Sequence, residues 1–174
     1  LINNAGFGDF GMFTETDWSK ELQMINLNIT TLTHFTKLYL KDMVKRRSGK
    51  IMNVASVAAF QPGPTAAVYC ATKAFVLSFS EAVSNEVSEK GITITSLCPG
   101  PTETGFKAAA AMEESNLFKG KKLPSAKVVA TYGYSSMLKG KTVAIHGIMN
   151  TIGANFSRFV PRALVLKIGR KIVD

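Results

Sequence analysis

The chain has 174 residues, of which 46% are hydrophobic and 19% charged, as is typical of one folded domain with an apolar core, and this composition argues against disorder. The net charge of +9 is uneven, because residues 119–174 hold 11 Lys and Arg against one Asp, whereas residues 1–118 are close to neutral. No apolar run approaches the ~18 residues that a membrane-spanning helix requires, and no stretch resembles a signal peptide.

The cysteines and histidines do not form a metal or disulfide pattern. Cys70 and Cys98 lie in apolar contexts without ligand spacing, so we expect free thiols in a reducing, cytoplasmic compartment. His34 and His146 have no carboxylate or histidine at ligand spacing, which favours structural or solvated roles. We expect no nucleic-acid partner, because no basic stretch is interleaved with aromatic residues.

The first predicted element is a strand that ends at Asn3, followed by a turn at 4–8 whose glycines allow a close approach of the backbone. Capping residues up to Asp17 precede a helix, which the spacing of apolar residues extends over 17–44. Because the chain opens in the last residues of a strand, we expect an N-terminally truncated part of a longer chain.

The next predicted unit is a strand, a turn and a helix. An apolar run at 50–55 predicts a buried strand that ends before Ser56, and the prolines and glycine within 61–64 break regular structure. A long helix is predicted over 66–90, with Gly91 as its cap.

The rest of the chain continues this alternation. The predicted elements are a strand at 92–97, a loop with a small helix at 102–118, a helix at 124–138, a strand at 142–145 and a basic amphipathic helix from Pro161. Strands that alternate with long helices predict a parallel sheet with helices on both faces. We therefore expect a three-layer α/β fold in which residues 1–174 form a single domain.

Three polar side chains converge in this scheme. Ser56 lies at the carboxyl end of a strand, and Tyr69 and Lys73 share one helix face because they are four residues apart. Open α/β sheets bind ligands at such strand ends. A phenol titrates near pH ~10, so Tyr69 would need a neighbouring positive charge, such as that of Lys73, to act as a general acid/base.

A wider set of motifs carries a family resemblance. Asn-Asn-Ala-Gly at 3–6, Asn28, Ser56, the Tyr69–Lys73 pair, and Pro99-Gly100 with Thr104 occur in this order. Their order and spacing resemble the short-chain dehydrogenase/reductase family. The resemblance implies a Rossmann-like doubly wound sheet, of which this chain would supply strands four to seven. It also implies an NAD- or NADP-dependent oxidoreductase that interconverts a carbonyl and a secondary alcohol, with NADP slightly favoured.

The resemblance also implies residue roles. The catalytic residues would be Tyr69, Lys73, Ser56 and Asn28, and the cofactor would contact Asn3, Ala5, Gly6, Tyr69, Lys73, Pro99, Gly100 and Thr104. The family's glycine-rich TGxxxGxG turn, which holds the cofactor pyrophosphate, does not occur in these residues. We therefore expect the chain by itself to bind a nicotinamide cofactor weakly or not at all.

The expected substrate is a hydrophobic carbonyl or alcohol. The residues expected around it are mostly apolar and include Phe7, Val57, Phe60, Phe106 and Met112. By family analogy, the helices at 17–44 and 66–90 would form a homodimer or tetramer interface. The basic helix that begins at Pro161 has three possible locations: it could lie on an anionic membrane, pack across the mouth of the active site, or face solvent.

Simpler interpretations of the same residues also stand. Tyr69 fits an amphipathic helix as a core or interface residue, Ser56 fits a turn, and Asn26 competes with Asn28. The motifs at 3–6 and 99–100 also fit plain strand endings. A non-catalytic remnant that acts as a protein-interaction module is the alternative to an enzyme.

Overall fold

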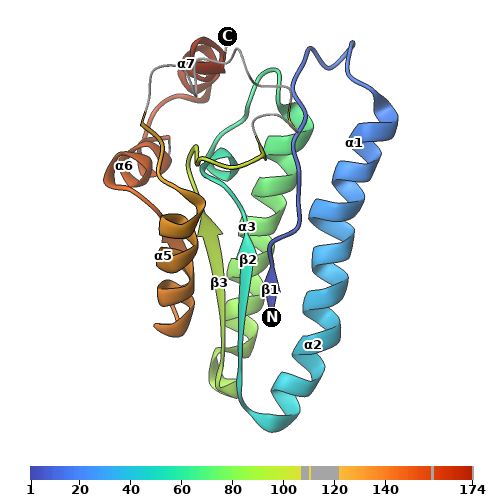
Figure 1. Ribbon diagram of the computed structural model, residues 1–174, viewed down its shortest axis with the longest axis vertical. Helices are drawn as coiled ribbons and strands as arrows, with labels where there is room; N and C mark the ends of the chain where they lie inside the picture. The colour runs from blue at the N-terminus through green and yellow to red at the C-terminus, as the bar shows by residue number, and fades with distance from the viewer. Residues whose placement is uncertain (107–109, 111–121, 158, 174) are drawn as a thin grey trace.

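The computed structural model describes residues 1–106, 110, 122–157 and 159–173. In this part of the chain, a parallel sheet has the strand order β1-β2-β3-β4, and Figure 1 shows β1, β2 and β3 side by side. The strands are β1 (Ile2–Asn3), β2 (Gly49–Val54), β3 (Ile92–Cys98) and β4 (Val143–Ile145). The longest pairing joins β2 and β3 in an uninterrupted register from Gly49 opposite Ile92 to Val54 opposite Leu97.

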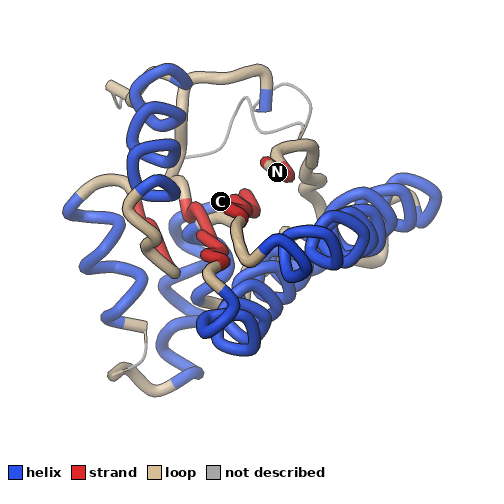
Figure 2. The backbone as a smooth tube through the Cα atoms, turned by 90° about the horizontal axis from the view of Figure 1, so that it is seen from below, coloured by secondary structure: helices blue, strands red, loops and turns tan. Residues whose placement is uncertain are grey.

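Helices cover both faces of the sheet, as Figures 1 and 2 show. One face carries α1 (Trp18–Ile25), a π-helical turn (Asn26–Thr31), α2 (Leu32–Arg46) and α3 (Ala67–Val87). The other carries α5 (Ala126–Leu138). Helices α6 (Ile148–Phe156) and α7 (Arg162–Val173) follow β4 and lie toward the carboxyl ends of the strands.

Alternation along the strands separates two apolar cores. Ile51 packs with Met43 of α2 and Val87 of α3, whereas the next residue, Met52, packs with Met137 of α5. Successive strand side chains point to opposite faces. The three-layer α/β architecture is therefore confirmed.

A buried polar network crosses the layer between the sheet and α2 and α3. The Asn3 side-chain amide donates to Thr36 Oγ1 at 3.0 Å and to Asn53 Oδ1 at 2.8 Å. Asn53 Nδ2 in turn donates to Ser80 Oγ at 2.9 Å. These bonds satisfy buried polar groups and join β1, β2, α2 and α3 at one level.

Most predicted elements are confirmed to within one or two residues. The helix predicted over 17–44 contains a π-helical turn, and a 3₁₀ turn at Val57–Phe60 follows Ser56. Helix α6 was not predicted, because one glycine and two asparagines interrupt its apolar residues. The small helix predicted within 102–118 lies largely outside the described residues.

Across the described ranges, the structure has no helix that is long and apolar enough to cross a membrane.

Candidate active site

A cavity of about 670 Å³ opens at the carboxyl ends of β2 and β3, within the size range of small-molecule sites. Its lining is mainly apolar, with a few polar groups. Many of the predicted site residues line it together: Gly6, Phe7, Ser56, Val57, Tyr69, Lys73, Pro99, Gly100, Thr104 and Phe106. The fold thus brings together residues that are up to a hundred positions apart in the sequence.

Tyr69 lies in the first turn of α3 and is 8% exposed. Its ring packs between Phe10, with ring centroids 6.2 Å apart, and Phe106, at 5.4 Å. Burial raises the pKa of Tyr69 to about 12, and a hydrogen bond with Ser56 lowers it by a smaller amount. The phenol is therefore neutral near pH 7 and available as a proton donor.

Lys73 lies one helical turn after Tyr69 and is 6% exposed. Its Nζ donates to the Val54 carbonyl oxygen at 2.8 Å and lies 5.9 Å from the Tyr69 ring centroid. Burial lowers the pKa of Lys73 to about 8. The expectation that Lys73 would lower the pKa of Tyr69 is not met in this structure, because desolvation dominates for both side chains.

Ser56 combines two roles that the sequence left as alternatives. Its Oγ caps the 3₁₀ turn by accepting from the Ala58 N–H at 3.1 Å. The same side chain lies close enough to the Tyr69 phenol to lower its pKa. A turn-forming serine therefore also holds its hydroxyl beside the phenol.

Asn28 is positioned by the π-helical turn. It is 1% exposed, whereas its rival Asn26 is exposed. Asn28 Oδ1 accepts from the Phe7 N–H at 3.3 Å, and Nδ2 donates to the Phe7 carbonyl at 3.0 Å and to Thr72 Oγ1 at 3.1 Å. Thr72 Oγ1 donates to the Tyr69 carbonyl at 2.8 Å. The asparagine thus connects the turn after β1 to the helix that carries Tyr69, and π-turns often mark such functional positions.

Only some of the predicted cofactor-binding residues at the end of β1 and in the turn after it line the cavity. The Asn3 side chain lies in the buried network, and Ala5 is exposed and does not line the cavity. Gly6 does line it, and a Cβ at this position would stand 2.9 Å from Asn28 Oδ1 and 3.4 Å from Lys73 Nζ. Glycine is therefore required where the backbone passes closest to the polar groups.

One predicted substrate residue is placed away from the cavity, and another is not described. Phe60 packs on the core cluster of Leu32 and Val76 instead of lining the cavity. Met112 lies outside the described residues.

Several cavity residues were missed by sequence reasoning. They include Asn4 and Cys70, which lie within the motifs at 3–6 and 69–73, and Phe10, Val129 and Gly169, which lie outside the motifs. Asn150 of α6 lies against Gly100, where an added Cβ would overlap its side-chain amide. The sequence carried no signal for Val129 and Gly169, since only the tertiary packing of α5 and α7 brings them to the cavity.

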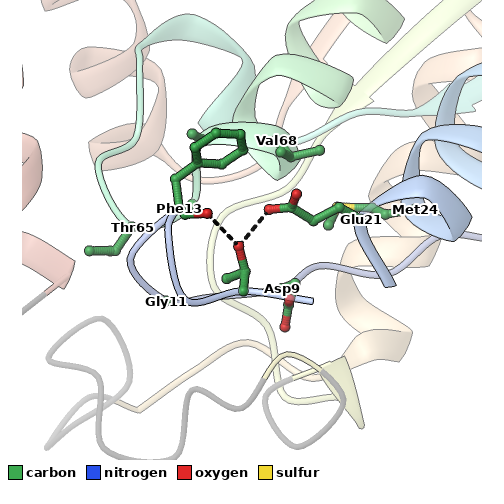
Figure 3. A pocket seen from close by; sticks show the side chains of 10 residues that line it. Asp9, Gly11, Phe13, Glu21, Met24, Thr65 and Val68 are labelled. Carbon is green, nitrogen blue, oxygen red and sulfur yellow. Dashed lines mark hydrogen bonds between the residues drawn. The ribbon is translucent and has the colours of Figure 1, made fainter. Parts of the chain in front are cut away.

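A small pocket of about 20 Å³ lies beside the loop that carries Phe10, as Figure 3 shows. There, Thr16 Oγ1 donates to Glu21 Oε1 at 2.8 Å, and Lys20 pairs with Asp9 at 2.6 Å. The pocket has room for about one water molecule. Its polar contacts stabilise the loop and hold Phe10 against Tyr69.

The arrangement can move a proton. A hydroxyl, a phenol and an ammonium face one apolar cavity, and the part of the chain that the structure describes contains no cluster of three or more metal-binding side chains. Proton transfer to or from a substrate oxygen is the chemistry that these groups support.

The chain matches known proteins in sequence and structure. Residues 1–115 match the family model for short chain dehydrogenases. The chain is 34% identical over 100 residues to a 3-oxoacyl-acyl-carrier-protein reductase of Haemophilus influenzae, covering 58% of this chain and 41% of that protein. It is 41% identical over 101 residues to the 17-beta-hydroxysteroid dehydrogenase type 3 of Mus musculus, covering 57% of this chain and 33% of that protein.

Solved structures also match. A short-chain dehydrogenase from Sphingobium yanoikuyae in complex with NADPH superimposes with a TM-score of 0.78 and 26% identity. The match covers 91% of this chain and 62% of that one. The chain therefore spans less than two thirds of the length of these relatives.

Proposed function

This chain belongs to the short chain dehydrogenase family, and we propose that it carries the catalytic part of an NAD(P)-dependent oxidoreductase acting on a hydrophobic carbonyl or secondary alcohol. The observation that carries the proposal is the convergence of Ser56, Tyr69 and Lys73 on one apolar cavity. The order of the motifs along the chain supports the same assignment.

The residues of the chain have distinct tasks in this reaction. Tyr69, neutral near pH 7, donates a proton to the substrate oxygen during reduction, whereas in the oxidation direction its phenolate form accepts that proton. Ser56 holds that oxygen beside the phenol. Lys73 is a second desolvated proton carrier one turn away, and Asn28 positions the helix of Tyr69 through Thr72.

The cavity fits the nicotinamide end of a dinucleotide. Gly6 lets the backbone pass close to Asn28 and Lys73 Nζ. Gly6, Lys73, Pro99 and Gly100 line the cavity and would hold the nicotinamide. A bound nicotinamide supplies or accepts the hydride. NADP and NAD both suit these residues, and the relative from Sphingobium yanoikuyae binds NADPH.

The cavity lining supports a hydrophobic substrate. Phe7, Phe10, Val57 and Phe106 contribute apolar surface around the Tyr69 phenol. Relatives named for 3-oxoacyl and hydroxysteroid substrates agree with this class.

Turnover of a ketone series tests the proposal. Reduction of long-chain 3-oxoacyl thioesters, aryl ketones and steroid ketones by the full-length enzyme, with NADPH and NADH, is expected to exceed oxidation of polyols. Tyr69→Phe is expected to lower kcat by 10²-fold or more, the order of one general acid. Tyr39→Phe, at a tyrosine that is 51% exposed on α2, is the matched control. Activity on polyols alone, or full activity in Tyr69→Phe, would overturn it.

A protein-interaction role is the second candidate. The outer surfaces of α1, α2 and α3 expose large apolar side chains: Trp18, Leu22, Phe35, Leu38, Tyr39 and Phe75. This surface supports self-association into a homodimer or tetramer through these helices. It is compatible with catalysis and would also remain in a non-catalytic protein.

A further inference from the structure

Helix α6 presents an apolar surface to solvent. Ile148 and Met149 are 80% and 78% exposed, and Ile152 and Phe156 are 54% and 58% exposed. Their spacing places all four on one side of the helix, opposite the buried Ala154. Phe159, just beyond the helix, is 84% exposed. We call these five residues the α6 face; single exposed apolar residues are ordinary, but a contiguous set marks an interaction site.

The α6 face lies in a segment whose charge is of one sign. From residue 119 to residue 173 the chain has no acidic residue. The exposed cations on the neighbouring helices include Lys127 in the first turn of α5 and Arg162 and Lys167 of α7. Figure 1 shows α5, α6 and α7 grouped on the side of the sheet away from α1.

We propose that the α6 face docks on the surface of an anionic lipid bilayer, with the cations of α5 and α7 beside it. An interfacial helix combines an apolar face that enters the acyl boundary with cations that meet the lipid headgroups. A second copy of the chain fits less well, because an isologous contact would bring equal positive charges together with no acidic residue in the segment to pair them. Membrane contact is one of the positions that the sequence leaves open for the basic helix from Pro161, and the α6 face adds a second exposed apolar surface to the same segment of the chain.

The docking surface is linked to the candidate active site. Ser157 Oγ, at the end of α6, donates to the Phe60 carbonyl oxygen at 3.1 Å, in the turn that Ser56 caps. Gly169 of α7 lines the cavity itself. Docking through α6 therefore holds one wall of the cavity near the lipid boundary, where a hydrophobic substrate would be concentrated. This consequence rests on the proposed function, whereas the docking does not.

Vesicle co-sedimentation tests the apolar contact. The probe is phosphatidylcholine vesicles with about one third phosphatidylglycerol, compared with phosphatidylcholine alone. The purified protein is expected to bind the anionic vesicles at least about tenfold more tightly. The double variant Ile148→Ser with Ile152→Ser, and the single variant Phe156→Ser, are each expected to weaken binding at least about tenfold. Phe13→Ser, at a residue that is 65% exposed on the amino-terminal loop, is the matched control.

Charge reversal tests the cations separately. Arg162→Glu with Lys167→Glu is expected to abolish the preference for anionic vesicles, whereas Lys45→Glu, at an exposed lysine of α2, leaves it unchanged. Equal binding of all variants, or no binding by the wild-type protein, overturns the proposal. A change from dimer to monomer in the α6 variants without vesicles, seen by sedimentation velocity, also overturns it in favour of a second copy. Circular dichroism verifies that each variant is folded.

Discussion

At the scale of single residues, the candidate active site buries two ionisable side chains, and burial disfavours the charged form of each. Lys73 and Tyr69 are both more than nine-tenths buried, and burial moves their pKa values in opposite directions, to about 8 and about 12. Each side chain is thereby held in its neutral form over a wider pH range than in water. A cavity that disfavours charge suits proton transfer and weakens the folded state.

Lys73→Met is expected to stabilise the protein near neutral pH. Lowering the pKa of Lys73 from 10.5 to about 8 corresponds to a charge-burial cost of about 3 kcal/mol. The lost hydrogen bond to the Val54 carbonyl offsets part of the gain, so the net increase in the free energy of unfolding is about 1–2 kcal/mol.

The pH dependence of this gain has a defined sign. Because the folded-state pKa lies below the unfolded value, the wild-type penalty is complete below pH 8 and disappears as the pH rises to 10.5. Chemical denaturation of both proteins between these pH values measures the difference. Lys37→Met, at an exposed lysine of α2, is the control and is expected to change little. A destabilised Lys73→Met protein at pH 7 would contradict the account.

At the scale of elements, the π-helical turn and α7 shape the site. The π-helical turn at Asn26–Thr31 turns Asn28 inward and leaves Asn26 outside. Helix α7 contacts the cavity through Gly169, whose added Cβ would meet Pro62 O at 3.6 Å and Pro64 Cδ at 3.7 Å. A methyl group fits there at ordinary contact distance, whereas a longer side chain would enter the cavity.

Gly169 is therefore expected to set the size limit of the substrate. Gly169→Leu is expected to lower kcat/KM for bulky ketones at least about tenfold while turnover of small ketones is retained, because the added side chain occupies cavity space. Gly169→Ala is the control: it keeps bulky-ketone activity and stabilises α7 by up to ~1 kcal/mol. Equal loss on small and bulky ketones would contradict a role in size selection.

At the scale of the whole molecule, exposed apolar helices predict self-association. Leu38 and Phe35 of α2 are 53% and 45% exposed on a helix that packs only its other side on the sheet. Leu38→Glu is expected to weaken a homodimer at least about tenfold, because it places a charge in a desolvated contact. Sedimentation velocity over a concentration series measures the change. Val128→Glu, 52% exposed on α5, is the control, and an unchanged association constant for Leu38→Glu would exclude this interface.

Much of the fold followed from local patterns. The β2–α3–β3 unit was predictable because apolar runs, a proline-rich break and the Gly91 cap, at a φ of 74°, are encoded within a few residues of each element. The motif residues were predictable for the same reason, since the Tyr69 and Lys73 spacing on one helix determines a shared face. Helix α6 was not predictable, because its apolar face is exposed in the part of the chain that the structure describes and its one glycine and two asparagines have low helix propensity.

The sequence by itself determined the fold class, the order of the elements and which polar residues could reach the strand ends. Only the tertiary structure decided that Asn28 faces inward, that Phe60 packs in the core, and that α7 contributes Gly169 to the cavity. It also decided the electrostatics, because burial raises the pKa of Tyr69 where spacing alone predicted that Lys73 would lower it. Spacing determines which groups are neighbours, whereas desolvation depends on everything packed around them.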